Sequence, residues 1–323
     1  MKRLLPLVCA LCLLMLTACT SPTPARSDTL TITTTTYPVY LLAQAVVAGI
    51  PDVTVERLDT GSVSCLHDYT LSVSDMKKIE RADVLAISGA GLEDFMADAL
   101  AATDAVVIDC SEGVELLPAT GHHDHEHNSE YHSHFDPHYW MDPLRAQIMV
   151  DNLCLGLAEV LPKHKETLHT NAQIAAHPLK MAYHTSRSAL SLLEEENATV
   201  PGLITFHDGF QYFAQALDLP LLRSIEEEAG SEASAKEIVE IARLVNELDI
   251  PVIFTEVNGS DATANAIARE TGCAVVELSM LMDGPEPPPL ERPNPGTIYA
   301  DLFFDNVAAL TNGFAQREVF TLP

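Results

Sequence analysis

Two separate stretches of this chain alternate short apolar segments with helical segments. Residues 29–35 are rich in β-branched side chains and predict a strand, and Tyr37 to Gly49 then indicates a helix that ends at glycine. The same alternation restarts after residue 200. Strands that alternate with helices favour parallel sheets covered on both faces, so we expect an α/β protein of two lobes. The expected strands are 29–35, 53–58, 83–88, 105–110, 203–206, 219–223, 251–256 and 274–278.

The segment between the two series, Pro143 to Asn197, contains almost no glycine and is rich in residues that favour helix. Pro162 predicts a break within it, followed by a helix of about thirty residues that would span about 45 Å. A helix of that length can run along both lobes and connect them stiffly. We therefore expect an N-terminal lobe at 29–162, a connecting helix at 163–198 and a C-terminal lobe at 199–323.

The first nineteen residues have the pattern of an export signal. Lys2 and Arg3 precede an apolar run from Leu4 to Leu16, which is too short to span a bilayer of roughly 30 Å. The run ends in Leu-Thr-Ala-Cys, which resembles the cleavage site of bacterial lipoproteins, with Cys19 as the lipidated residue. The sequence thus predicts a signal peptide at 1–18, a tether at 19–28 and attachment to the bacterial cell envelope through lipid on Cys19. An ordinary signal peptide with an incidental cysteine is the alternative.

The charge balance limits the partners of the chain. It has 18 lysines and arginines against 46 acidic residues, a formal net charge of −28 at pH 7. Nucleic acid is excluded as a partner, because phosphate binding requires a basic surface. A cation is the class of ligand to consider first, and we expect a monomer.

Four cysteines remain in the exported chain beside Cys19. In an oxidising compartment they could form disulfides in three pairings, and buried free thiols are an equal alternative. These cysteines are Cys65, Cys110, Cys154 and Cys273.

Residues 121–138 hold a dense cluster of histidines interleaved with acidic side chains. No helix or strand buries such a pattern, so we expect a solvated loop. Closely spaced neutral imidazoles can chelate zinc without a preformed cage, which suggests low-affinity capture of zinc or a similar metal. The loop histidines expected to do this are His122, His123, His125, His127, His132 and His134.

Three other histidines stand in contexts that suggest fixed positions. His67 follows the second expected strand, His138 lies in an apolar segment between two prolines, and His207 ends a strand of the second series. Ligands of open α/β sheets bind just outside such strand ends. The three are separated by 71 and 69 residues, so they could meet only if the fold brings the two lobes together.

Several motifs, in order along nearly the whole chain, resemble those of the zinc and manganese substrate-binding proteins of ABC transporters. They are Cys65-Leu66-His67-Asp68-Tyr69, Asp136-Pro137-His138-Tyr139-Trp140-Met141-Asp142-Pro143 and Thr205-Phe206-His207-Asp208-Gly209-Phe210, together with the histidine-rich loop. The resemblance implies two α/β lobes joined by one rigid helix, with a metal in the cleft between them. It also implies a receptor that delivers the metal to the membrane permease of an ABC transporter, which works with a cytoplasmic ATPase.

The resemblance also implies the ligands and the metal. His67, His138 and His207 fall on three ligand positions of the family. Manganese-type members usually carry glutamate where His207 stands, and imidazole suits zinc, so Zn²⁺ is the expected cargo, with Mn²⁺ or Fe²⁺ as the alternative.

The fourth ligand position departs from the family pattern. Members commonly have an aspartate after the last strand, where this chain aligns Ser279 or Met282. Asp283 after a small shift, Glu256 on a neighbouring strand, or water are the alternatives. Cys65 could place a thiolate near the metal, although a buried or disulfide-bonded cysteine is the preferred interpretation.

Two aspartates directly follow expected ligands. Asp68 and Asp208 could accept hydrogen bonds from the neighbouring imidazoles and set their tautomers. Asp208 could equally cap the helix that follows it.

Two other functions need to be weighed. A zinc hydrolase would also use three histidines, but the chain has no H-E-x-x-H motif. A lipid-anchored surface adhesin would also suit the exposed loop. We therefore do not expect an enzyme, and we keep the adhesin as an alternative to the metal receptor.

Overall fold

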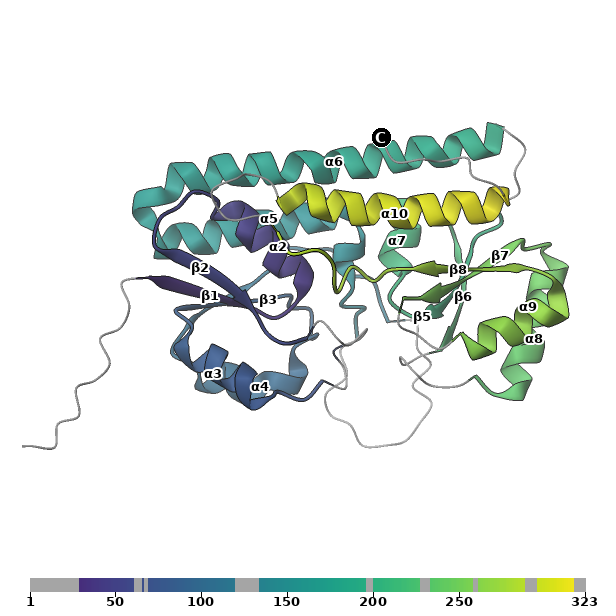
Figure 1. Cartoon of the computed structure of the whole chain (residues 1–323), viewed down its shortest axis with the longest axis horizontal. Coiled ribbons are helices and arrows are strands. Elements are labelled where there is room, and N and C mark those ends of the chain that lie inside the picture. The colour runs from purple at the N-terminus through teal and green to yellow at the C-terminus, as the bar shows by residue number, and fades with distance from the viewer. Residues whose placement is uncertain are drawn as a thin grey trace, which may run out of the picture.

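The computed structural model of the chain consists of two α/β lobes side by side, with long helices running over both (Figure 1). It describes residues 29–60, 66, 69–119, 134–195, 200–226, 233–257, 261–287 and 295–316. The expected signal peptide, the tether and the lipidated Cys19 lie outside these residues. None of the helices in the described ranges is long and apolar enough to cross a membrane.

Each lobe contains a four-stranded sheet in which all strands are parallel. The strand order is β2-β1-β3-β4 in the N-terminal lobe and β6-β5-β7-β8 in the C-terminal lobe, so the two lobes share one connectivity. The strands are β1 (Leu30–Thr34), β2 (Val53–Arg57), β3 (Val84–Ile87), β4 (Val106–Asp109), β5 (Leu203–His207), β6 (Leu221–Glu226), β7 (Val252–Glu256) and β8 (Ala274–Leu278).

Helices connect the strands and cover both faces of each sheet. They are α2 (Tyr37–Val46), α3 (Val73–Arg81), α4 (Ala97–Ala102), α5 (Pro143–Val160), α6 (Lys165–Glu195), α7 (Gln211–Ala216), α8 (Ala235–Glu247), α9 (Ala262–Thr271) and α10 (Pro295–Ala315), with 3-10 turns η1 (Asp94–Met96), η2 (Tyr139–Met141) and η3 (Pro162–His164).

Alternate strand residues enter different cores, as the two-residue period of a strand requires. Val84 joins a large core, whereas its neighbour Leu85 packs with Ile79 of α3 in a small cluster. In the other lobe Phe254 joins the same large core, and Ile253 enters a separate cluster under α8 and α9. The large core is therefore continuous through both lobes, which ties them into one body.

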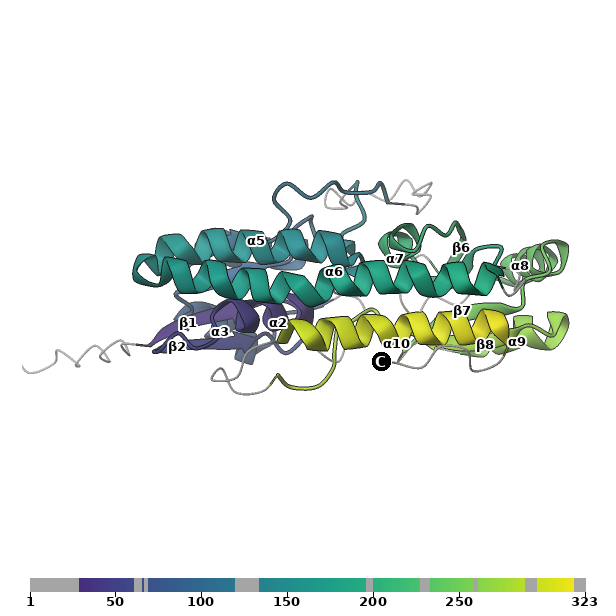
Figure 2. The same cartoon turned by 90° about the horizontal axis from the view of Figure 1, so that it is seen from above.

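The helix α6 provides much of that continuity. It has 31 residues and packs against α2 and α5 of the N-terminal lobe and against α10. Seen from above, α6 and α10 lie side by side along the length of the molecule (Figure 2). The predicted fold class, two α/β lobes joined by one long helix, is confirmed.

Two details differ from what the sequence suggests. The sequence from Leu92 to Ala101 suggests one helix, but the structure has a 3-10 turn followed by the short α4, and the chain before it has positive φ angles at Ala90 and Gly91. The six prolines of residues 284–296 suggest a loop that ends before a helix at Tyr299, but the last helix already begins at Pro295. Proline suits the first turn of a helix, where its missing N–H removes no hydrogen bond.

Cysteine pairing was left open by the sequence. Cys110, Cys154 and Cys273 are buried free thiols in the structure, so within the described ranges no disulfide forms. Cys65 lies outside the described residues.

Candidate metal site between the lobes

The carboxyl ends of both sheets face the junction between the lobes (Figure 1). In each sheet the order in which strands are added reverses between the two central strands, β1 and β3 in one lobe and β5 and β7 in the other, because one crossover leads to one edge and the next leads to the other. Such reversal points are where open α/β sheets bind ligands. The candidate site lies where the reversal points of the two lobes meet.

His138 and His207 meet at this junction from different lobes. His207 is the last residue of β5, and His138 directly precedes η2. Their ring centroids lie 5.1 Å apart with the rings nearly perpendicular, and both residues are only 4% exposed. The fold therefore brings together two of the three predicted histidine ligands.

The ring of His207 has no hydrogen-bond partner on either nitrogen among the described residues. A buried polar atom that lacks a partner costs about 1–3 kcal/mol. A metal ion bound by one nitrogen would satisfy that atom. This orphaned ring indicates that the site is shaped for a ligand.

Asp136 fixes the ring of His138. Its Oδ1 lies 2.7 Å from His138 Nδ1 and accepts a 2.9 Å hydrogen bond from the main-chain N–H of His138. With Nδ1 protonated toward this carboxylate, Nε2 is the nitrogen left for a metal. The other oxygen, Oδ2, accepts a 3.0 Å hydrogen bond from Gln211 of α7, so the same carboxylate links the two lobes.

Hydrogen bonds from aromatic residues hold the segment after His138. The Tyr139 hydroxyl donates to the main-chain oxygen of Ser88 at 2.5 Å, and Trp140 Nε1 donates to that of Met280 at 2.9 Å. The Tyr299 hydroxyl in turn donates to the main-chain oxygen of Trp140 at 2.6 Å. All three aromatic residues are fully buried, so the main chain directly after His138 is firmly held.

The buried carboxyl group of Glu93 lies at the ends of β1 and β3. Glu93 accepts hydrogen bonds from Thr35 Oγ1 at 2.5 Å and from the main-chain N–H groups of Ser88 and Gly89 at 2.8 and 2.9 Å. Burial outweighs these donors and raises the pKa of Glu93 to about 7.

His67 lies outside the described residues, so its predicted role as a ligand stays a prediction. The structure does describe how the loop that carries it is anchored. Asp75 Oδ1 accepts from the main-chain N–H of Asp59 at 2.8 Å, before the loop, and Oδ2 accepts from the Tyr69 hydroxyl at 2.8 Å, after it. Asp75 also forms the predicted cap of α3 with Ser72. One carboxylate thus holds both ends of the loop.

The candidates for the fourth position lie in different surroundings. Asp283 is 59% exposed at its side chain and pairs with Arg57 of β2, Oδ1 to Nη2 at 3.4 Å. Glu256 is buried at the end of β7. Since Thr205 pairs with Phe254, Glu256 is level with His207 on the neighbouring strand. Both acidic residues stay predictions as ligands.

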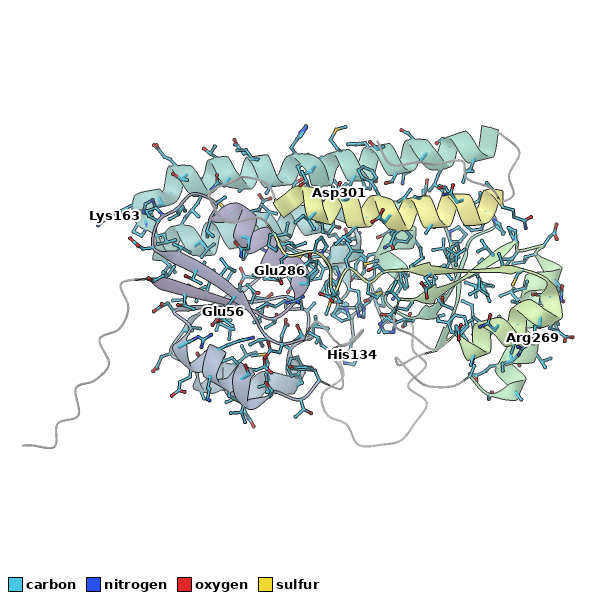
Figure 3. All side chains as sticks on the ribbon, in the orientation of Figure 1. Glu56, His134, Lys163, Arg269, Glu286 and Asp301 are labelled. Atoms are coloured by element: carbon cyan, nitrogen blue, oxygen red, sulfur yellow. The ribbon has the colours of Figure 1, made fainter. Side chains whose placement is uncertain are left out.

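The histidine-rich loop leaves and rejoins the fold beside the site. Ala119 donates to the main-chain oxygen of His134 at 3.1 Å, and Asp136 donates to that of Leu117 at 2.9 Å. Figure 3 shows His134 at the junction of the lobes. The other predicted loop ligands, His122, His123, His125, His127 and His132, lie outside the described residues.

Sequence reasoning missed the carboxylate that orients His138. It assigned such a role to Asp68, outside the described residues, and to Asp208, which instead accepts a 3.2 Å hydrogen bond from Ser224. The alternative that Asp208 caps α7 is wrong, because the residue preceding α7 is Phe210. The Asp-Pro-His spacing was the available signal for Asp136, since two residues suffice for a side chain to turn back onto the histidine.

Within the described ranges, no group of three or more histidine, cysteine, aspartate or glutamate residues is arranged to hold a metal. The described part of the site is the pair His138 and His207 with its supporting carboxylate.

Comparison with known proteins identifies relatives that are similar to this chain in sequence. The zinc-binding lipoprotein AdcA of Streptococcus pneumoniae is 29% identical over 316 residues, 96% of this chain and 60% of that protein. AdcA of Streptococcus pyogenes is 29% identical over 265 residues, 77% of this chain and 50% of that protein. The chain therefore spans less than two thirds of these relatives. A putative metal-binding protein of Treponema pallidum is 28% identical over 270 residues, 80% of this chain and 82% of the other.

Solved structures show the same fold. A Zn(II)-bound mutant variant of AdcAII from Streptococcus pneumoniae has a TM-score of 0.72 at 26% identity and covers 89% of this chain and 99% of its own. The laminin-binding adhesin Lmb from Streptococcus agalactiae has a TM-score of 0.71 at 23% identity, over 88% of this chain and 99% of its own, and this likeness concerns the fold alone.

A protein-family model shows which family the chain belongs to. The model described as the periplasmic component A of zinc-uptake complexes, ZnuA, matches residues 32–313. That range contains both sheets, the long helix α6 and both histidines of the candidate site. The chain belongs to the ZnuA family of zinc-uptake complex components.

Proposed function

We propose that this chain is an extracytoplasmic receptor that binds one Zn²⁺ between its lobes and delivers it to a membrane ABC permease with a cytoplasmic ATPase. His67, His138 and His207 supply the imidazole ligands. The observation that carries the proposal is the buried ring of His207, which has no hydrogen-bond partner among the described residues and lies 5.1 Å from the oriented ring of His138. In the family, such a site holds cargo, so no catalytic step is assigned to it.

Zinc is the proposed cargo because of the ligand chemistry. Imidazole suits zinc, whereas manganese prefers carboxylate oxygens, and among the described residues no carboxylate hydrogen-bonds to the ring nitrogens of His207. The AdcA relatives are named as zinc-binding proteins, which supports the same metal. Mn²⁺ and Fe²⁺ are the competing cargoes that the test must exclude.

We propose that lipid on Cys19 anchors the chain to the outer side of the bacterial membrane and that the protein acts as a monomer. The histidine-rich loop begins and ends beside Asp136, so metal held weakly on the loop starts close to the tight site. The relative AdcA of Streptococcus pneumoniae is named a lipoprotein, which supports the anchor.

The test is a metal competition on the purified protein at known free concentrations of zinc and manganese, followed by metal analysis. We expect one tightly held Zn²⁺ against excess manganese, and its loss in His207→Ala. His177→Ala is the matched control, because His177 is exposed on α6 and away from the junction. Tight manganese or iron binding, or zinc retention in His207→Ala, contradicts the proposal.

Binding to host matrix proteins that survives His207→Ala would instead support an adhesin; the laminin-binding proteins Lmb of Streptococcus agalactiae and Lbp of Streptococcus pyogenes share the fold of this chain. Ester or peptide hydrolysis lost in His207→Ala would support a zinc hydrolase.

A further inference from the structure

The chain between β8 and α10 crosses from one lobe to the other, and its described part is residues 279–287, here called the crossing segment. Its far end is fastened to the N-terminal lobe. Arg57 Nη1 donates to the main-chain oxygen of Met282 at 3.3 Å, and the Tyr37 hydroxyl donates to that of Pro285 at 2.5 Å. Tyr40 donates to Glu286 at 3.2 Å, and Figure 3 shows Glu286 near α2.

This fastening determines which residue of the crossing segment lies at the site. Arg57 pairs with the side chain of Asp283 at the end of β2, where Asp283 is largely exposed. Because the same guanidinium also binds the preceding main-chain oxygen, Asp283 is held at the surface of the N-terminal lobe. The aspartate that the sequence suggested as fourth ligand therefore already has a partner.

Met280 is the residue of the crossing segment that reaches the two histidines. It is 3% exposed. A Cβ atom placed on Gly209 would meet the Cε methyl of Met280, His207 Cδ2 at 3.0 Å and His138 Cγ at 3.1 Å. The end of the Met280 side chain and both rings thus converge on one point above Gly209.

The backbone around Met280 is fixed from both sides. Asn306 binds Ser279 twice, accepting from its N–H at 2.7 Å and donating to its oxygen at 2.7 Å. Trp140 holds the oxygen of Met280, and Leu281 follows with a φ of 59°, a conformation that turns the chain sharply. Such a specified turn keeps the Met280 side chain at the junction and directs Asp283 away from it.

We propose that the thioether sulfur of Met280 is the fourth ligand of this site, in place of a carboxylate. The inference deepens the metal-receptor function proposed above and rests on it. Thioether sulfur is a soft, polarisable ligand that selects Cu⁺ and is compatible with Zn²⁺, whereas carboxylates favour Mn²⁺. The site therefore accepts Cu⁺ as well as Zn²⁺ and discriminates against Mn²⁺.

Glu256 is the competing candidate, because it is buried and level with His207. The two candidates predict opposite selectivity, since a carboxylate ligand strengthens binding of manganese and a thioether ligand strengthens binding of Cu⁺. Variants of the two residues separate them.

The experiment measures affinities for Zn²⁺, Mn²⁺ and, under anaerobic reducing conditions, Cu⁺, each against a chelator of known affinity. Met280→Leu conserves the volume and apolar character of the side chain and removes the sulfur. We expect it to weaken Cu⁺ binding at least tenfold and Zn²⁺ binding less than fivefold. Met181→Leu is the matched control, because Met181 is exposed on α6, and it should change neither affinity. X-ray absorption of the Cu⁺-loaded protein should show one sulfur ligand, absent in Met280→Leu.

Equal Cu⁺ affinity in the unaltered protein and in Met280→Leu overturns the inference, and so does the absence of a sulfur ligand in the absorption spectrum. Met280 would then only pack against the two histidines. Loss of zinc in Glu256→Gln with no effect of Met280→Leu assigns the fourth position to Glu256 and overturns it as well. In both cases zinc still depends on His207, so the receptor function stands. Zinc binding that does not depend on His207 contradicts the function itself. If Met280→Leu does not fold, the absorption spectrum of Cys65→Ser decides, because this variant keeps Met280 and removes the other sulfur that could lie near the metal.

Discussion

Asp136 and His138 are joined by two hydrogen bonds at the lobe junction. One carboxylate oxygen of Asp136 bonds to both the main-chain N–H and the ring Nδ1 of His138. The second oxygen of Asp136 binds Gln211 of the other lobe. The residue that orients the proposed ligand His138 is therefore also hydrogen-bonded to the opposite lobe.

The first prediction concerns this pair. Asp136→Asn removes the charge that stabilises the Nδ1–H tautomer of His138, and we expect zinc affinity to fall about 10- to 100-fold, the usual effect of losing such a partner. The measurement is zinc competition against a chelator, with circular dichroism to confirm the fold. Asp208→Asn is the control, because Asp208 bonds to Ser224, and it should lower affinity less than threefold. Equal losses in both variants would refute the role of Asp136.

A second prediction concerns Gly209, which lies against both rings. Alanine there would meet the Cε methyl of Met280, which must move, and would press on His207 Cδ2 and His138 Cγ at 3.0 and 3.1 Å, so each ring must shift by a few tenths of an ångström. We expect Gly209→Ala to reduce zinc affinity about tenfold. Gly313→Ala is the control, because its Cβ would meet Val252 at 3.1 Å in the core. Urea unfolding of both variants measures any change in stability, and only Gly209→Ala should lose zinc affinity.

The third prediction is a pH dependence of stability that comes from Glu93. Its pKa is raised by burial to about 7 in the folded protein, whereas it is about 4.5 in an exposed chain. The folded state therefore holds the proton more tightly, and stability must fall as pH rises from about 4.5 to about 7, by about 3 kcal/mol.

Urea unfolding of the metal-free protein at several pH values measures this effect. Glu93→Gln cannot ionise, so the difference between the two proteins isolates Glu93 from other titrating groups. The difference should change across that pH window and be constant above about pH 8. A difference that is the same at pH 4.5 and pH 8 would show that Glu93 ionises freely in the folded protein.

Much of the fold could be predicted from the sequence because its determinants are local. Ser72 and Asp75 form the capping box that their three-residue spacing indicates, and each strand shows its short apolar run directly. His138 and His207 could be named because each stands in a distinctive local motif. Their meeting required the resemblance to a family, since 69 residues separate them in the sequence.

The fourth position could not be predicted, because it depends on contacts between distant segments. The sequence left Asp283, Glu256 and water as alternatives and did not suggest Met280, which stands three residues before Asp283. Their placement is decided by Arg57, which binds the crossing segment from the other lobe, and by Trp140, which holds the main chain of Met280. Asp136 was missed for a related reason, since its role depends on the path of the main chain around Pro137.

The last prediction concerns the anchors of the loop that carries His67. Burial alone would raise the pKa of Asp75, but hydrogen bonds from Asp59, Ser72 and Tyr69 lower it below its ordinary value, so the group stays ionised and binds both ends of the loop. Tyr69→Phe removes one of these bonds. We expect it to cost about 1 kcal/mol of stability and to lower zinc affinity several-fold, because the loop that carries the proposed ligand His67 then loses one of its anchors. Urea unfolding and zinc competition measure the two effects, and protease cleavage within residues 61–68 should become faster. Tyr183→Phe, on α6, is the control and should leave zinc affinity unchanged. If Tyr69→Phe lowers stability but binds zinc as tightly as the unaltered protein, the anchored loop does not contribute a ligand, and the assignment of His67 fails with it.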